Sequence, residues 1–373
     1  MTATFIGPLT ALFLVAGSAW TMPSVQRPTL PFGVRVPVQR AGDDAIAEQV
    51  RAFRTRVAGA GLLALIATIT LGTVFSTAEE ETLALIGSAP TVALLLLVAL
   101  FYLRARRAIL RVKTTDDWYG GLAQRVAVDT SLRTRSERFP WAWTLPALLT
   151  LLGTLAVGIV LYPDMPARIP MRTTGLEVHA WQPKSPWVVG LPVTIGLFTT
   201  ALVIGLLAWS YRSRADLEPS APVRSAAQHR LFLQRIGRAL LLFTAGMNAA
   251  MLFAFVPIWQ GRTPGVAAMT GLMLVCLLST AYLIIVGVRT GQGGSRILAD
   301  EQGTERPDAA HFDDDRYWRF VGLCYVNRED PAILVQKRVG LGWTFNFGNP
   351  RSYLVLAGIL VITALIVLVP VLA

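Results

Sequence analysis

The sequence contains few side chains that could do chemistry, and these side chains are scattered along the chain. The three histidines are His179, His229 and His311, and the two cysteines are Cys276 and Cys324. None of them falls in a zinc-ligand spacing, an HExxH motif, a Gly-x-Ser-x-Gly elbow or a phosphate-binding loop. Catalysis therefore has no candidate residues, and the sequence predicts a protein that is not an enzyme and needs no cofactor.

One acidic cluster could bind a hard divalent cation through its carboxylate oxygens, because Asp313, Asp314 and Asp315 closely follow His311. The alternative is a solvated acidic turn that caps a helix beginning near Asp315, where negative charge is favourable. We favour the turn, so no metal site is predicted.

The composition is that of a membrane protein. Of the 373 residues, 53% are hydrophobic and only 15% are charged, whereas soluble domains carry about a quarter charged residues. The charges cluster between continuous apolar runs long enough to cross a bilayer as helices, so we predict an all-α polytopic membrane helix bundle of about eight transmembrane helices. The predicted spans are 4–22, 57–77, 83–103, 141–162, 187–210, 237–257, 265–288 and 352–372.

The interiors of the predicted spans contain no ionisable residue, which argues against a proton-coupled transporter because such proteins place charges in the membrane. The most polar interior residue is Asn248, which lies among small neighbours. We expect it to form an interhelical hydrogen bond; contact with a substrate is the alternative.

The number of lysine and arginine residues is alternately high and low in the successive segments that connect the spans. Thirty of the 34 basic residues fall on one side and four on the other. Because positive residues are retained in the cytoplasm, this bias predicts that both termini are extracytoplasmic. The net charge of +11 is then a topology signal rather than a sign of nucleic-acid binding.

Two polar segments have a composition of their own. The outer segment 163–186 is rich in proline and glycine and is expected to form a shaped loop. On the inner side, a flexible linker at 291–310 precedes an aromatic module at 311–350. Within that module we predict a small β-hairpin, in which strands 320–326 and 332–339 are joined by a turn.

The predicted organisation places these segments among helix groups. It comprises an N-terminal part with three transmembrane helices (1–140), a helix pair enclosing the outer loop (141–210), a second helix pair (211–290), the linker (291–310), the aromatic module (311–350) and the last transmembrane helix (351–373).

Tyr162-Pro163, Pro166, Ile169-Pro170, Gly175, Trp181 and Lys184-Ser185 resemble the extracytoplasmic motif of a bacterial membrane family. That family is a domain of unknown function shared with SdpI-type immunity and signalling proteins. The motif usually has a histidine two positions after the Ile-Pro pair, where this chain has Arg172, so no role of that histidine is carried over.

A second resemblance lies near the C-terminus. It is carried by Asp314, Tyr317-Trp318, Tyr325, Asn327, Asp330-Pro331, Val335, Lys337-Arg338, Gly340, Gly342-Trp343-Thr344 and Asn346-Phe347, which look like an uncharacterised module often found at the end of such proteins. Together the two resemblances imply a multi-pass protein of the bacterial inner membrane, and they lend no enzymatic reaction.

The resulting hypothesis is a non-enzymatic immunity, envelope-sensing or signalling protein that works through the outer loop 163–186 and the inner module 312–347. The alternative is a transporter or lipid-handling protein that uses the helix bundle itself. Expected partners are the lipid bilayer, a peptide or envelope ligand outside and a protein inside, with no nucleic acid. The candidate contact residues are Tyr162, Pro163, Ile169, Pro170, Gly175, Trp181, Lys184, Tyr317, Trp318, Asn327, Lys337, Arg338, Trp343 and Asn346.

Overall fold

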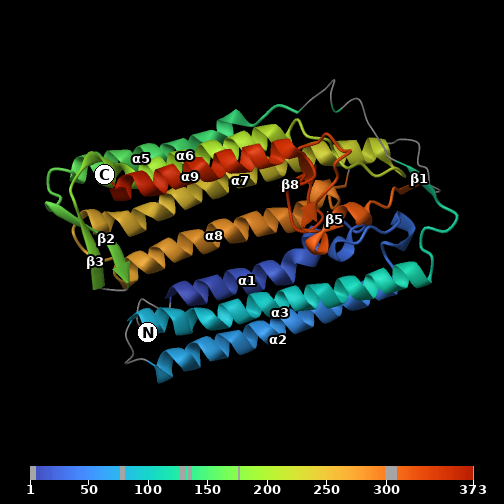
Figure 1. The fold of residues 1–373 in the computed structure, drawn as a ribbon, viewed down its shortest axis with the longest axis horizontal. Coiled ribbons are helices and arrows are strands. Elements are labelled where there is room, and N and C mark those ends of the chain that lie inside the picture. The colour runs from blue at the N-terminus through green and yellow to red at the C-terminus, as the bar shows by residue number, and fades with distance from the viewer. Residues whose placement is uncertain are drawn as a thin grey trace.

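The computed structural model describes residues 6–75, 80–125, 132, 137–174, 177–298 and 309–372. Within these residues the fold is an elongated bundle of helices (Figure 1). Each predicted span corresponds to one long helix. The helices are α1 (Ile6–Val25), α2 (Asp44–Val74), α3 (Glu80–Thr115), α5 (Leu145–Leu161), α6 (Pro186–Ser210), α7 (Pro222–Trp259), α8 (Val266–Thr290) and α9 (Pro350–Leu372).

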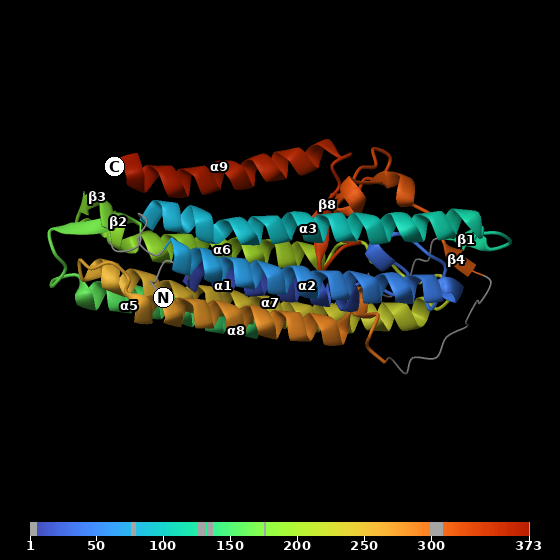
Figure 2. The ribbon, with the colours of Figure 1, turned by 90° about the horizontal axis from the view of Figure 1, so that it is seen from below.

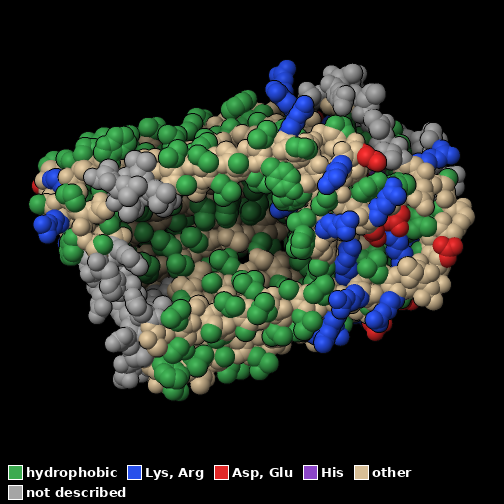
Figure 3. Space-filling view, in the orientation of Figure 1, with side chains coloured by type: hydrophobic (Ala, Val, Ile, Leu, Met, Phe, Trp, Pro, Cys, Tyr) green, Lys and Arg blue, Asp and Glu red, His purple; other side chains and the backbone are tan. Residues whose placement is uncertain are grey.

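The surface of the bundle is that of a multi-pass membrane protein. Among the described residues, seven helices are long and apolar enough to cross a bilayer, and α9 adds a shorter apolar stretch at Pro350–Leu365. The helices carry a band of exposed apolar side chains, such as Leu63 on α2, Val160 on α5 and Leu354 on α9. Figure 3 shows this apolar band and the gathering of Lys and Arg at one end, which we call the basic end.

The helices form two groups joined by one bridging helix. The first group contains α1, α2 and α3, and the second contains α5, α6, α7 and α9. Helix α8 packs against α7 on one side and α1 on the other, so it connects the groups (Figure 1). Figure 2 shows α9 at the edge of the bundle opposite α8. On the face shown in Figure 3, the surface between the two groups is hollowed and hydrophobic side chains line the hollow.

The second group packs through small and polar residues in its interior. The side-chain amide of Asn248 in α7 donates to Thr200 Oγ1 (3.0 Å) on α6 and to the carbonyl oxygen of Ala147 (3.4 Å) on α5. Gly196 leaves the space in which this amide lies. The predicted interhelical hydrogen bond is therefore confirmed.

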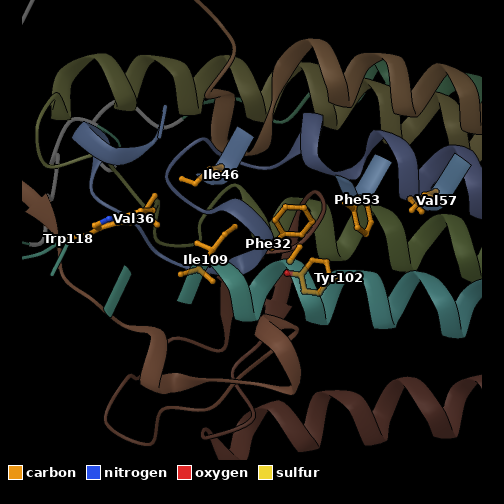
Figure 4. Close-up of a cluster of buried hydrophobic side chains, with 11 residues drawn as sticks. Phe32, Val36, Ile46, Phe53, Val57, Tyr102, Ile109 and Trp118 are labelled. Carbon is orange, nitrogen blue, oxygen red and sulfur yellow. The ribbon is translucent and has the colours of Figure 1, made fainter. Parts of the chain in front are cut away.

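Near the basic end, the chain after α1 folds back against α2 and α3 through a buried apolar cluster (Figure 4). Phe32 packs edge-on against Phe53 and Tyr102, with ring centroids 5.2 and 5.5 Å apart. Ile109 on α3 and Trp118 just after the end of α3 extend the cluster. Helix α2 begins well before its apolar part, with Asp43 as N-cap accepting from the Ala45 amide. This cluster gives the basic end a core of its own.

Two β-strands at the opposite end pair as an antiparallel hairpin between α5 and α6. We call this the hairpin end, and α1 begins and α9 ends there (Figure 1). The strands are β2 (Arg168–Thr174) and β3 (Glu177–Pro183). The outer segment is thus a regular hairpin at its base, a form that its prolines did not suggest.

The basic end carries the remaining strands. They are β1 (Ala123–Arg125), β4 (Ala309–His311), β5 (Trp318–Arg319), β6 (Cys324–Tyr325), β7 (Leu334–Gln336) and β8 (Trp343–Phe345). Strands β1 and β4 pair in parallel, whereas β5 pairs with β6 and β7 pairs with β8 in antiparallel fashion.

The predicted pairing of 320–326 with 332–339 is therefore wrong, although a β-hairpin module does precede the last helix. Each strand instead turns back on a nearer neighbour at a glycine with positive φ, Gly322 (87°) between β5 and β6 and Gly340 (77°) between β7 and β8. Because such turns close locally, they prevent the longer pairing.

The predicted flexible linker at 291–310 also differs from expectation at its start. Residues 292–294 form a buried turn in which the Gln292 side chain donates to the carbonyl oxygens of Lys337 (3.2 Å) and Gly342 (2.9 Å). The Gly342 amide donates back to Gln292 Oε1 (3.0 Å). Positions 299–308 of the predicted linker lie outside the described residues.

Candidate functional site

Four separate parts of the chain bring charged side chains together at the basic end. They are the segment after α1, the end of α3, the segment between α6 and α7, and residues 309–347. From here on, the module means these residues 309–347, which run from the start of β4 to just before α9. We call the resulting set of ion pairs the buried charge network. Its members are Arg27, Arg35, Lys113, Asp216, Asp313, Asp314, Asp315 and Arg338.

Arg338 is the most deeply buried member of the network. Its side chain is only 1% exposed and forms ion pairs with Asp314 and Asp315. The guanidinium also lies 4.9 Å from the centre of the Trp318 ring. Its Nη1 donates to the carbonyl oxygen of Gly33 (3.0 Å), and this contact joins the module to the segment after α1.

Arg35 and Arg27 extend the network to the second helix group. Arg35 Nε donates to Asp314 Oδ1 (2.7 Å) and its Nη2 to Asp216 Oδ2 (3.2 Å). Arg27 donates to the same Asp216 oxygen (3.1 Å) and to Gln336 Oε1 (2.6 Å). Asp216 thus receives two arginines from the first group although it belongs to the segment between α6 and α7.

Lys113 at the end of α3 completes the network by pairing with Asp313 Oδ2 (2.7 Å) and Asp315 Oδ2 (2.8 Å). A short turn does begin at Asp315, as the sequence suggested, but the acidic run is ion-paired and half-buried rather than solvated. Basic side chains occupy the oxygens that a cation would need. No group of three potential metal ligands occurs in the part of the chain that the structure describes.

The surroundings keep the carboxylates charged and the histidine neutral. Burial alone would raise the pKa of Asp216, but the guanidinium groups of Arg35 and Arg27 hold that pKa well below its usual range. Burial would also raise the pKa values of Asp314 and Asp315, but Arg35 and Arg338 lower the pKa of Asp314, and Arg338 and Lys113 lower the pKa of Asp315. Burial, and then Arg35, lowers the pKa of His311 to about 4. Its contact with Asp216 (3.6 Å) is therefore that of a neutral imidazole at neutral pH.

A cavity of about 380 Å³ opens beside the network. Four of the predicted contact residues line it, namely Tyr317, Trp318, Asn327 and Arg338. The other lining side chains include Arg35, Asp216, His311, Asp314, Tyr325 and Asp330, which were not among the predicted contacts. The wall therefore combines paired charges with aromatic rings.

The remaining inner residues of the prediction organise the module. Asn346 is fully buried, and its amide donates to the carbonyl oxygens of Asn327 (2.8 Å), Asp330 (3.0 Å) and Ala332 (3.1 Å). Trp343 packs against Phe232 of α7, with ring centroids 5.7 Å apart. Lys337 is exposed and lies outside the cavity wall. The contacts of Asn346 and Trp343 thus hold the module together and against α7.

The outer residues of the prediction lie at the hairpin end, so the structure does not bring the two sets together (Figure 1). Lys184 Nζ donates to the carbonyl oxygens of Tyr162 (2.9 Å) and Met165 (3.2 Å) at the end of α5 and lies 4.8 Å from the centre of the Tyr162 ring. Ile169 is fully buried against Trp259 of α7. These contacts fix the base of the hairpin.

The other residues of the outer set differ in how far solvent reaches them. Pro170 is buried opposite Trp181 in the hairpin register, whereas the Trp181 side chain is 49% exposed and Pro163 is also exposed. The predicted contact Gly175 lies outside the described residues. Trp181 and Pro163 are thus the most exposed of the described members, whereas Tyr162 and Lys184 are half-buried.

The fold defines a multi-pass helical membrane protein, and one comparison adds a family for its C-terminal part. Residues 328–353 match a family model described as a family of unknown function (DUF5808). The match includes Arg338, Trp343 and Asn346 and ends at the beginning of α9. It agrees with the expectation of an uncharacterised module there. No curated protein and no solved structure matches the chain.

Proposed function

We propose that the protein is a non-enzymatic sensing or signalling component of the bacterial inner membrane, in the manner of the SdpI-type immunity proteins that it resembles. In this proposal the hairpin end and both termini are extracytoplasmic, and the basic end faces the cytoplasm. The concentration of Lys and Arg at that end supports the orientation, because positive residues are retained in the cytoplasm.

The observation that carries this proposal is that the buried charge network connects both helix groups. Arg35 and Lys113 belong to the first group, Asp216 belongs to the second, and Asp314 in the module contacts Arg35. A shift of one group relative to the other must therefore stretch or break directed ion pairs. The module 309–347 is placed to respond to such a shift.

The hairpin supplies the other half of the proposed pathway. Strands β2 and β3 directly connect α5 with α6, and Ile169 and Lys184 fix the hairpin base to the helix ends. A peptide or envelope ligand that contacts the exposed Trp181 would act on the second group alone. The expected consequence is a relative movement of the groups, which the network passes to a cytoplasmic protein partner.

A pair of substitutions tests this proposal in cells whose response depends on the protein. Trp181→Ala removes the exposed outer contact and Arg338→Met removes the central cation of the network, so both should abolish the response. Trp187→Ala is the matched control, because Trp187 is 72% exposed at the same end but lies in α6 rather than in the hairpin. A full response from either test variant, at normal protein levels, refutes the proposal.

The hollow between the helix groups favours a second candidate function. It is lined by hydrophobic side chains and lies within the apolar band, so its surface matches an acyl chain in polarity (Figure 3). A lipid-handling protein would use this surface without charges in the membrane. Purified protein in vesicles with a fluorescent phospholipid would then exchange lipid between leaflets. Exchange that Trp181→Ala does not alter would support this candidate over the first.

A further inference from the structure

The turn between β5 and β6 holds two large apolar side chains on the surface. Phe320 is 77% exposed and Leu323 is 56% exposed. Phe320 and Val321 have φ angles of 45° and 64°, in the left-handed region that non-glycine and especially β-branched residues rarely adopt. The fold therefore maintains a strained turn that leaves these two side chains uncovered.

Packing beneath the turn fixes its position relative to α3. A Cβ atom at Gly322 would lie 3.6 Å from Gly33 Cα and 3.5 Å from Arg106 Nη1, so the backbones lie close together. Val321 packs against the buried cluster that contains Phe32, and Arg106 donates to the carbonyl oxygen of Phe32 (3.2 Å). The turn is thus held against the Tyr102–Arg106 part of α3.

That part of α3 marks the edge of the apolar band. The sequence from Leu83 to Leu103 contains no charged residue, and Arg104 is the first of a series of arginines. The start of α9 indicates the same depth in the membrane for the turn. Tyr325, two residues after Leu323, forms a β-bridge with Asn346, which lies four residues before the apolar helix α9 begins at Pro350. The turn therefore lies where hydrocarbon gives way to headgroups.

We propose that Phe320 and Leu323 insert into the boundary between lipid headgroups and acyl chains, so that the turn is a membrane-surface anchor for the module 309–347. Apolar and aromatic side chains are favoured at this depth. Arg319 next to Phe320, and Arg104 and Arg107 on α3, are exposed near the same level. Their charge suits anionic phospholipid headgroups.

Spin labels at single cysteines measure this depth directly. The background variant carries Cys276→Ser and Cys324→Ala, and labels are then attached to Phe320→Cys or Leu323→Cys. The protein is held in nanodiscs containing phosphatidylglycerol, and collision rates are compared for oxygen, which partitions into lipid, and a water-soluble nickel chelate. Each variant retains the other apolar side chain of the pair.

Two further labels calibrate the measurement. Glu329→Cys places a label on an exposed polar position of the same module, and Leu100→Cys places one on a 40% exposed position of α3 within the apolar band. At 320 and 323 we expect several-fold lower nickel accessibility than at 329, with oxygen accessibility between those at 329 and 100. Nickel accessibility equal to that at 329 overturns the proposal, because the turn then faces water, as a docking surface for a soluble protein would.

The lipid charge is tested by repeating the measurement in nanodiscs of phosphatidylcholine alone. A shallower label at 320 with an unchanged label at 100 is expected if Arg319 and its neighbours bind anionic headgroups. An unchanged label at 320 overturns that part of the proposal. The labels report depth whether or not cells respond to Trp181→Ala, so this test is independent of the proposed sensing function.

Discussion

Replacing Arg338 with methionine should open the module at the basic end without unfolding the membrane helices. Methionine keeps an apolar stem in the place of the arginine stem but removes the cation that pairs with Asp314 and Asp315. Removing one partner of a buried ion pair costs about 3–5 kcal/mol, because the other partner stays buried with its charge.

The lower end of that range applies here, because both carboxylates keep other partners. Asp314 retains Arg35 and the indole N–H of Trp318, and Asp315 retains Lys113. A loss of about 3 kcal/mol corresponds to roughly 150-fold faster hydrogen exchange in the module, if exchange proceeds through its local opening.

Hydrogen exchange by mass spectrometry on protein in nanodiscs measures this change peptide by peptide. The matched control is Arg214→Met, since Arg214 is 61% exposed and forms one ion pair with Asp330 (3.0 Å). Asp330 is only 7% exposed but keeps the Tyr325 hydroxyl as a donor (3.0 Å), and the cation of the pair lies in solvent. Pairs with such a solvated cation contribute about 0–1 kcal/mol, so exchange should rise less than about fivefold. Equal effects from the two variants would refute the reasoning that burial gives Arg338 its importance.

Three further predictions follow from the same contacts. The pKa of His311 is about 4 in the folded module against an ordinary 6.5, so the unfolded module binds the proton first as the pH falls. The stability of the module should therefore fall by up to about 3 kcal/mol between pH 6.5 and pH 4. Hydrogen exchange, corrected for its intrinsic pH dependence, should depend less on pH in His311→Gln than in the natural protein. Asn248→Ala should lower helix-bundle stability by about 1 kcal/mol in denaturing detergent titrations, because its hydrogen bonds to Thr200 and Ala147 are lost; an unchanged midpoint contradicts this. Asn346→Ala removes five hydrogen bonds and should cost about 3 kcal/mol or more, with faster exchange concentrated at 327–332; a uniform increase across the module argues against it.

The helices could be predicted from the sequence because hydropathy is a local property. Each apolar run carries its own evidence for a span, and the polar residue Asn248 within one run had few partners other than neighbouring helices. The strands of the module were harder, because apolar composition alone does not specify a partner. There the glycines Gly322 and Gly340 decided the pairing through turns that close within a few residues.

The buried charge network could not be predicted from local patterns. Arg35 has the character of a basic loop residue that sets topology, and the run Asp313–Asp315 has that of a solvated acidic turn. Each interpretation is reasonable for a segment considered alone. The pairing depends on Asp216, which lies 181 residues from Arg35 in the sequence and 3.2 Å from it in the fold. One signal was present, namely a run of three aspartates inside otherwise basic segments.

The buried charge network lies beside a well-packed apolar cluster, and this arrangement indicates that the network does more than stabilise the fold. Phe32 and its neighbours already hold the segment after α1 against α2 and α3. Apolar replacements of a buried ion pair are often as stable as the pair itself, so stability alone gives no reason for charges here. Ion pairs of this kind differ from apolar contacts in being directional, because a small displacement of Arg35 from Asp216 weakens the charge-assisted hydrogen bond between them. An apolar seam would tolerate sliding, whereas this network distinguishes one arrangement of the helix groups from another. The proposed sensing function requires this discrimination between arrangements.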